Sequence, residues 1–245
     1  MKASPPRRDV RVLAALWLLG MAGVASLLAV PLELALPAGM DVPRWALLIN
    51  PALFVAVAVP LGWWAAPRAG LSTPILAAMV HGKLPAFAWR AALPPILAVV
   101  AATAAILLAY GHATRAVFSA APDIAMPLIA RVLYGGIAEE IIVRWGVLST
   151  AIIALLSLRT TRAVAFWSAN ATAALLFAIG HFGMLFMLVP DPPMWLIAAV
   201  LAGNVLPGLG FGWLFARHGL EAAMLAHAGS HVLFVLVAPL VALSP

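Results

Sequence analysis

Residues 125–157 read AMPLIARVLYGGIAEEIIVRWGVLSTAIIALLS, and this stretch decides the fold class. It is apolar over more than the roughly 20 residues that an α-helix needs to cross a bilayer core of about 30 Å. It also contains the ionisable residues Arg131, Glu139, Glu140 and Arg144. Ionisable side chains inside a membrane span are costly, and those that occur there mark candidate functional sites. The stretch therefore predicts a transmembrane helix that carries such a site.

Further apolar stretches have lengths that suit membrane spans: 12–32, 45–66, 91–110, 163–187, 194–216 and 219–242. They lack the alternation of apolar and polar residues that marks a membrane β-barrel. The chain is 65% hydrophobic and 9% charged, whereas soluble domains carry about 25% charged residues. We therefore predict an all-α fold, a polytopic bundle of about seven spans that forms a single membrane domain over residues 1–245 in the lipid bilayer. The polar connection 67–90 is expected to hold a short interfacial helix.

The formal net charge is +6, but Arg and Lys are scattered singly between the apolar stretches. Nucleic-acid-binding proteins gather these residues on one face, so nucleic acid is excluded as a partner. Cationic connections alternate with acidic ones along the chain. The positive-inside rule then predicts a cytoplasmic N-terminus and an external C-terminus. The abundance of Arg and Ala favours a prokaryotic cytoplasmic membrane.

The doublet Glu139-Glu140 lies four residues before Arg144. Residues four apart share a helix face, so we expect Arg144 to pair with Glu140. Glu139 points about 100° away from Glu140 and is left as the reactive carboxylate, suited to act as a general base. A purely structural charge cluster that holds helices together is the alternative interpretation.

Three histidines also fall within predicted spans. A lone His in a span more often hydrogen-bonds a neighbouring helix than catalyses a reaction. His227 and His231, however, are four residues apart and must project from one face, and His181 lies on a different span. Imidazoles and carboxylates on three spans are less costly when they meet, so we expect them to converge on one cavity.

Three motifs in this order resemble those of the CAAX-protease and bacteriocin-processing (CPBP) family, which includes the Ras-converting CAAX endopeptidases. The motifs are Glu139-Glu140-x-x-x-Arg144, Phe177-x-x-x-His181 and His227-x-x-x-His231. The resemblance covers roughly residues 125–235, the expected catalytic core. It implies an intramembrane endopeptidase that hydrolyses a peptide bond of a membrane-associated or lipid-modified protein or peptide.

The resemblance also implies roles for individual residues. Water would be activated by Glu139 and His181, the oxyanion stabilised by His227 and His231, and the site ordered by Glu140 and Arg144. The last family motif usually ends in Asn, whereas this chain has His231. A neutral His still donates one hydrogen bond, so an oxyanion role remains chemically reasonable.

The same residues raise the question of a metal. Glu139, His181, His227 and His231 could together form a zinc site. A metal-independent reaction is favoured, because the chain has no His-Glu-x-x-His motif. It has no cysteine either, which excludes thiolate ligands and a Cys nucleophile.

Two other classes of function remain. A non-proteolytic membrane scaffold or immunity protein of the same fold would keep the helices without the chemistry. A proton-coupled transporter would use intramembrane Glu and His as relays, but it is expected to show repeat symmetry between its halves. Here the intramembrane charges lie in the second half of the chain, which disfavours transport.

The depths of the candidate residues differ along their spans. At about 1.5 Å per residue, Glu139 and His181 each lie about 27 Å from the cytoplasmic ends of their spans, and His227 only about 12 Å. The span 125–157 is also longer than a bilayer core requires. It must therefore tilt, kink at Gly135-Gly136 or protrude.

Overall fold

The computed structural model describes residues 9–31, 42–85, 87–118 and 126–242. Within these residues the elements are helical, and there is no β-strand. Seven helical stretches are long and apolar enough to cross a membrane. They are Val10–Ala29, Arg44–Ala69, Trp89–Phe118, Leu128–Ser157, Arg162–Leu188, Met194–His218 and Leu220–Leu240. Each overlaps one predicted span, which confirms the all-α transmembrane bundle.

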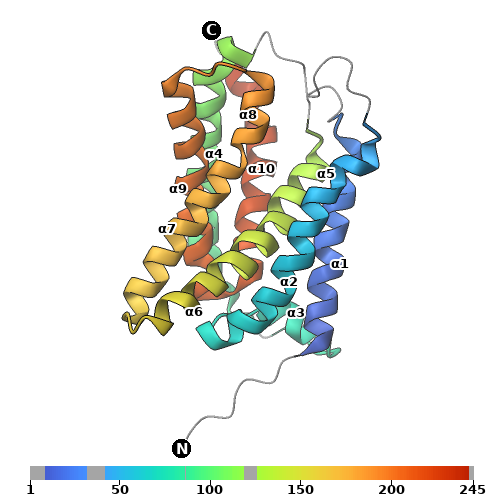
Figure 1. Ribbon diagram of the computed structural model, residues 1–245, viewed down its shortest axis with the longest axis vertical. Helices are drawn as coiled ribbons and strands as arrows, with labels where there is room; N and C mark the ends of the chain where they lie inside the picture. The colour runs from blue at the N-terminus through green and yellow to red at the C-terminus, as the bar shows by residue number, and fades with distance from the viewer. Residues whose placement is uncertain (1–8, 32–41, 86, 119–125, 243–245) are drawn as a thin grey trace, which may run out of the picture.

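Six of these spans are built mainly from regular α-helices. They are α1 (Val10–Ser26), α2 (Ile49–Ala69), α4 (Trp89–Phe118), α7 (Arg162–Gly180) with α8 (Phe182–Leu188), α9 (Met194–His218) and α10 (Leu220–Ala242). Two short 3₁₀ turns, η1 (Leu27–Ala29) and η3 (Arg44–Leu48), extend the first two spans. In Figure 1 helix α1 begins at the lower end of the bundle and helix α10 ends at the upper end.

The connection 67–90 contains a short helix, α3 (Pro74–Met79), as the sequence predicts. Pro74 occupies its first turn, where the missing N–H of proline costs no hydrogen bond. The carboxylate of Glu221, at the start of α10, accepts a hydrogen bond from the backbone N–H of Leu76 at 2.7 Å. Helix α3 is thereby attached to the last span of the bundle.

The fourth span is composite. Its segments are α5 (Leu128–Ala130), η4 (Arg131–Ala138), η5 (Ile141–Leu148) and α6 (Ser149–Ser157). Both η4 and η5 are π-helical, a conformation that is rare and frequent at functional sites. The span runs diagonally across the bundle, from the upper right to the lower left of Figure 1. Of the three expected ways to accommodate its length, the structure therefore shows a tilt.

Segment η4 packs between α1 and α10, and η5 packs on α2. The approach of η4 to α10 depends on Gly136, where an added Cβ would lie 2.6 Å from the Cβ of Ala228. Small residues allow this close approach between membrane helices. The packing brings the Glu139-Glu140 doublet, between η4 and η5, next to the face of α10 that carries the histidines.

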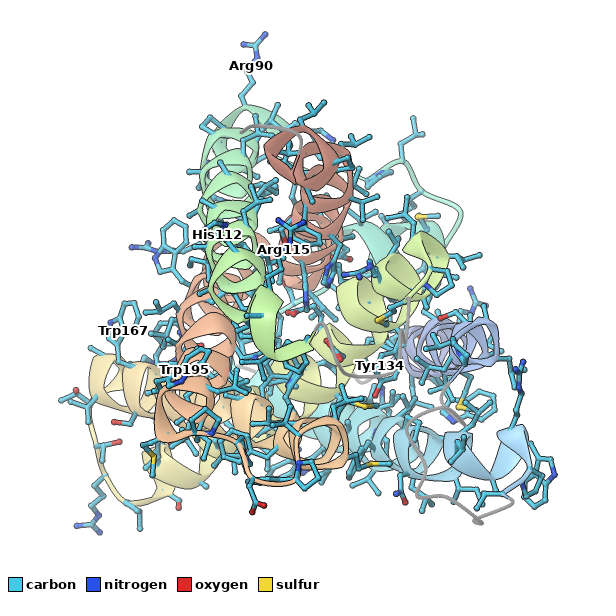
Figure 2. All side chains as sticks on the ribbon, turned by 90° about the horizontal axis from the view of Figure 1, so that it is seen from above. Arg90, His112, Arg115, Tyr134, Trp167 and Trp195 are labelled. Atoms are coloured by element: carbon cyan, nitrogen blue, oxygen red, sulfur yellow. The ribbon has the colours of Figure 1, made fainter. Side chains whose placement is uncertain are left out.

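The outer surface of the bundle is apolar, as expected of helices that face lipid. Large apolar side chains such as Phe54, Leu97 and Leu236 are each more than half exposed. Figure 2 shows Trp167 and Trp195 on the outside of the bundle, where they are 52% and 46% exposed. Amphipathic indole rings are enriched where membrane helices meet the interface.

Candidate active site

A cavity of about 290 Å³ lies among α4, η4, α7, α8, α9 and α10. Four side chains that the sequence singles out line it: Glu139, His181, His227 and His231. The three spans that carry them are therefore brought together at one place. This is the convergence expected from the cost of isolated ionisable groups in a membrane.

Glu140 faces away from this cavity into a buried ion-pair cluster. Its Oε1 lies 2.8 Å from Nδ1 of His227 and 3.2 Å from Nη1 of Arg144. Both Glu140 and Arg144 are almost completely buried, with 0% and 1% exposure. The pairing of Arg144 with Glu140 is the one that their four-residue spacing predicts. The contact with His227 is not foreseen by the sequence, because it joins two distant spans.

Arg144 is held by more than its carboxylate partner. Its Nη2 donates a hydrogen bond to the carbonyl oxygen of Gly208 on α9 at 3.0 Å. Its guanidinium carbon lies 5.3 Å from the ring of Phe177 and 5.5 Å from the ring of Phe211, within range of cation–π attraction. A buried charge is tolerated when it is paired and hydrogen-bonded, and Arg144 meets both conditions.

His227 lies between the buried cluster and the cavity. Its ring stacks on Phe211 with centroids 4.5 Å apart, and on His231 with centroids 5.0 Å apart. Because Nδ1 contacts Glu140, the other ring nitrogen, Nε2, is left for the cavity. The carboxylate thus fixes both the orientation of the ring and the nitrogen that a substrate would meet.

His181 lies where α7 ends and α8 begins. Its Nδ1 donates to the carbonyl oxygen of Phe177 at 2.9 Å, which fixes the proton on Nδ1 in the neutral ring. Nε2 is then a hydrogen-bond acceptor that can hold a water molecule. The ring of Phe177 meets that of His181 edge to face, with centroids 4.7 Å apart. The helix break at His181 was not predicted, since the apolar run continues through it.

Gly135 makes room for two of the candidate residues. A Cβ added at Gly135 would lie 2.9 Å from Nε2 of His231 and 3.9 Å from Oε2 of Glu139. Nδ1 of His231 is buried and has no hydrogen-bond partner among the described residues. The sequence marks Gly135 only as a possible kink, but its position one turn before Glu139 was a usable signal.

Residues 121–233 match the family model described as Rce1-like, type II CAAX prenyl endopeptidase Rce1-like. The match covers slightly less than half of the chain. The matched residues contain all three motifs, so the resemblance predicted from them is confirmed. Neither the comparison with curated proteins nor that with solved structures gave a match. At the level of the family, the activity is that of a CAAX-type intramembrane endopeptidase.

Within the matched segment, two further polar residues lie outside the cavity lining. Asn170 donates from Nδ2 to the carbonyl oxygen of Leu209 at 3.0 Å and so joins α7 to α9. Arg131 donates from Nε to the carbonyl oxygen of Met126 at 2.9 Å and lies over the ring of Phe234. Both contacts hold helices or chain segments together and leave the candidate chemistry to the four cavity residues.

The zinc alternative can be tested against the positions of the side chains. Among the described residues, no three His, Asp or Glu side chains are close enough together to hold a metal ion. The nitrogens that His181 and His227 leave for the cavity are the Nε2 atoms, because their Nδ1 atoms contact Phe177 and Glu140. As placed in the structure, the four cavity side chains do not form such a group.

Residues of the first half of the chain also line the cavity, although no motif marks them. They are Thr103, Leu107, Tyr110 and Phe118, all on α4. On α9 the cavity is lined by Asn204, whose Nδ2 donates to the carbonyl oxygen of Val200 at 2.8 Å. Their spacing is typical of any apolar helix, so the sequence alone could not separate them from lipid-facing residues.

Proposed function

We propose that the protein is an intramembrane endopeptidase that hydrolyses a peptide bond of a membrane-anchored or lipid-modified protein or peptide, with Glu139 as its general base. One observation carries this proposal. Glu139 lines the cavity together with His181, His227 and His231, whereas its neighbour Glu140 is paired with Arg144 and His227. The match to an endopeptidase family supports the same reaction.

The first step is the activation of water between Glu139 and His181. The carboxylate of Glu139 takes a proton from the water, while Nε2 of His181 accepts the second hydrogen and orients the oxygen. The hydroxide formed in this way attacks the carbonyl carbon of the peptide bond. A C–O bond forms, and the carbonyl oxygen becomes an oxyanion.

The second step depends on donors that face this oxyanion. Because Nδ1 of His227 contacts Glu140, a donating Nε2–H requires a ring protonated on both nitrogens. The carboxylate of Glu140 contacts both His227 and Arg144, and so holds the His227 ring in place. His231, stacked on His227, supplies a second N–H from a neutral ring. Preorganised donors of this kind stabilise an oxyanion more than its uncharged precursor.

The last step returns the proton. Protonated Glu139 gives its proton to the nitrogen of the leaving amine, and the C–N bond breaks. One product then carries a new carboxylate and the other a new amino group. One water is consumed, and the side chains return to their starting protonation states.

The test compares Glu139→Gln and Glu139→Ala with the unaltered chain in the native cell, by mapping the N- and C-termini of membrane proteins. We expect the same processed termini to vanish in both variants while the protein still accumulates in the membrane. The matched control is Glu221→Gln, which removes another carboxylate of a membrane span at a distance from the cavity. Unchanged termini in both Glu139 variants would overturn the proposal and favour a scaffold or immunity protein of the same fold.

A further inference from the structure

The cavity does not lie midway along the bundle. Helix α4 lines it from its midpoint to its end, with Thr103, Leu107, Tyr110 and Phe118. Phe118 is the last residue of α4, and Leu188, which also lines the cavity, is the last residue of α8. Both helix ends lie at the upper end of the bundle in Figure 1, where helix α10 also ends. The cavity therefore runs from the four candidate catalytic residues toward that end.

In the opposite direction the cavity ends on densely packed side chains. Its floor is formed by His227 and Phe211, and beneath them lie Arg144, Glu140 and Phe215. The last three, like Phe211, are each no more than 1% exposed. Arg144 also ties η5 to α9 through the carbonyl of Gly208. Opening a route for a peptide from this side would require breaking the buried ion pair.

The two ends of the bundle also differ in charge. At the end where α1 begins, the described connections and helix ends carry seven cationic residues: Arg11, Arg68, Lys83, Arg90, Arg159, Arg162 and Arg217. At the cavity end, the connections and helix ends carry Arg44, Arg115 and Asp191. Short connections rich in Arg and Lys remain in the cytoplasm. The cavity end is then the end on the outer side of the membrane.

We propose that the cavity receives its substrate from the extracytoplasmic side, as an extended apolar peptide segment at the outer surface of the membrane. A membrane-anchored polypeptide that has been exported supplies such a segment next to its anchor. Cleavage of that segment rests on the proposed function, but the direction of access does not. Asn204 on α9 suits a peptide, because its Nδ2 is bonded to Val200 and its Oδ1 is left to accept a peptide N–H.

The remaining lining supports the same class of ligand. Leu107, Phe118, Met184 and Leu188 form an apolar wall that favours apolar side chains over charged ones. Met184 is 37% exposed, so this wall reaches the surface of the protein at α8. A water-soluble reagent that reaches Met184 therefore reports on access to the cavity from that end.

The chain has no cysteine, so single-cysteine variants give a labelling experiment without background. Met184→Cys marks the cavity wall, and Lys83→Cys marks the opposite end of the bundle. Leu176→Cys is the matched control, because Leu176 is 52% exposed on α7 but does not line the cavity. A thiol that faces lipid stays protonated and unreactive, since the thiolate is the nucleophile.

Each variant is treated with a membrane-impermeant maleimide in right-side-out and in inside-out membrane vesicles. A parallel sample is treated with the same reagent after detergent is added, to show that the protein is present and that its thiol is reactive. We expect Met184→Cys to be labelled in right-side-out vesicles and Lys83→Cys in inside-out vesicles. Leu176→Cys is expected to react in neither until detergent is added.

Two outcomes overturn the inference. Labelling of Met184→Cys in inside-out vesicles, with Lys83→Cys reacting in right-side-out ones, would place the cavity mouth in the cytoplasm. Protection of Met184→Cys in both preparations would show that water does not enter the cavity from this end. Because labelling does not depend on hydrolysis, either result can be told apart from a failure of Glu139 as the catalytic base.

Discussion

Glu139 and Glu140 are neighbours in the chain, but their side chains lie in two different regions of the molecule. Glu140 is completely buried, with Arg144 at 3.2 Å and His227 at 2.8 Å. Glu139 lines a cavity of about 290 Å³ with three histidines around it. The difference shows that one helical turn can place two neighbouring carboxylates in unlike surroundings. Glu140 is paired with Arg144 and His227, whereas Glu139 faces the cavity.

The buried cluster is the region where the largest loss of stability is expected. Arg144→Leu leaves Glu140 without its guanidinium partner, and removing one member of a buried pair costs about 3–5 kcal/mol. We expect the free energy of unfolding in detergent to fall by this amount and processing to be lost with it. Arg162→Leu is the control, since Arg162 is exposed at the start of α7. Similar stabilities for the two variants would show that the ion pair does not hold the bundle together.

For Glu139, which faces the cavity, we expect a loss of activity without a loss of stability. Glu139→Gln keeps the size and polarity of the side chain but cannot take a proton from water. Removal of a general base lowers rates by about 10²–10⁴-fold, so we expect processing to fall in this range while the unfolding free energy changes little. The measurement is the rate of appearance of processed termini alongside unfolding in detergent. A variant that unfolds as readily as Arg144→Leu would assign Glu139 a structural role instead.

The sequence predicts those features that depend on local pattern. The length and apolar character of each span are local properties, and each of the seven spans overlaps its predicted position. The third span differs most, since it continues eight residues beyond its predicted end, to Phe118. The pairing of Glu140 with Arg144 follows from a four-residue spacing on one helix. The three motifs indicate the family because their order and residue types can be compared without coordinates.

Other features depend on how distant segments meet and could not be predicted. The contact of His227 with Glu140 joins residues on two spans, and its distance depends on the tilt of the fourth span. The π-helical segments η4 and η5 leave no mark in composition, because they differ from an α-helix only in hydrogen bonding. The break between α7 and α8 falls within an uninterrupted apolar run. The catalytic roles of the four cavity residues remain predictions.

A third variant tests the close approach of Gly135 to the side chain of His231. Gly135→Ala would place a methyl group 2.9 Å from Nε2 of His231, so the histidine or the helix must move. Overpacking of this kind costs about 1–3 kcal/mol. Displacement of a reacting group by about 1 Å costs up to 10²-fold in rate, so processing is expected to fall by more than stability alone explains.

The matched control for this variant is Gly111→Ala on α4, where an added methyl group meets no atom within 4 Å. Both variants are compared for unfolding in detergent and for the rate of processing. Full activity of Gly135→Ala would show that His231 can move without consequence. In that case the contact between Gly135 and His231 does not position the oxyanion donors.

A smaller effect is expected when His231 is replaced by the residue that usually ends the last motif of the CPBP family. His231→Asn keeps one N–H donor on the same face of α10, so processing should stay within about tenfold of the unaltered chain. His231→Leu removes the donor and should lower the rate by about 10²–10³-fold, as loss of an oxyanion donor does elsewhere. Equal activities of the two variants would exclude His231 from the oxyanion site.

The smallest effect is expected from chelation of metal ions. No group of three suitable side chains in the described part of the chain is placed to bind a metal. Processing by purified protein in the presence of a strong zinc chelator should therefore match that in its absence. If activity is lost on chelation and returns with added zinc, Glu139 becomes a metal ligand. Glu139 would then bind the metal, whereas Glu140 forms an ion pair with Arg144. The water would be activated by the metal instead of by a carboxylate base.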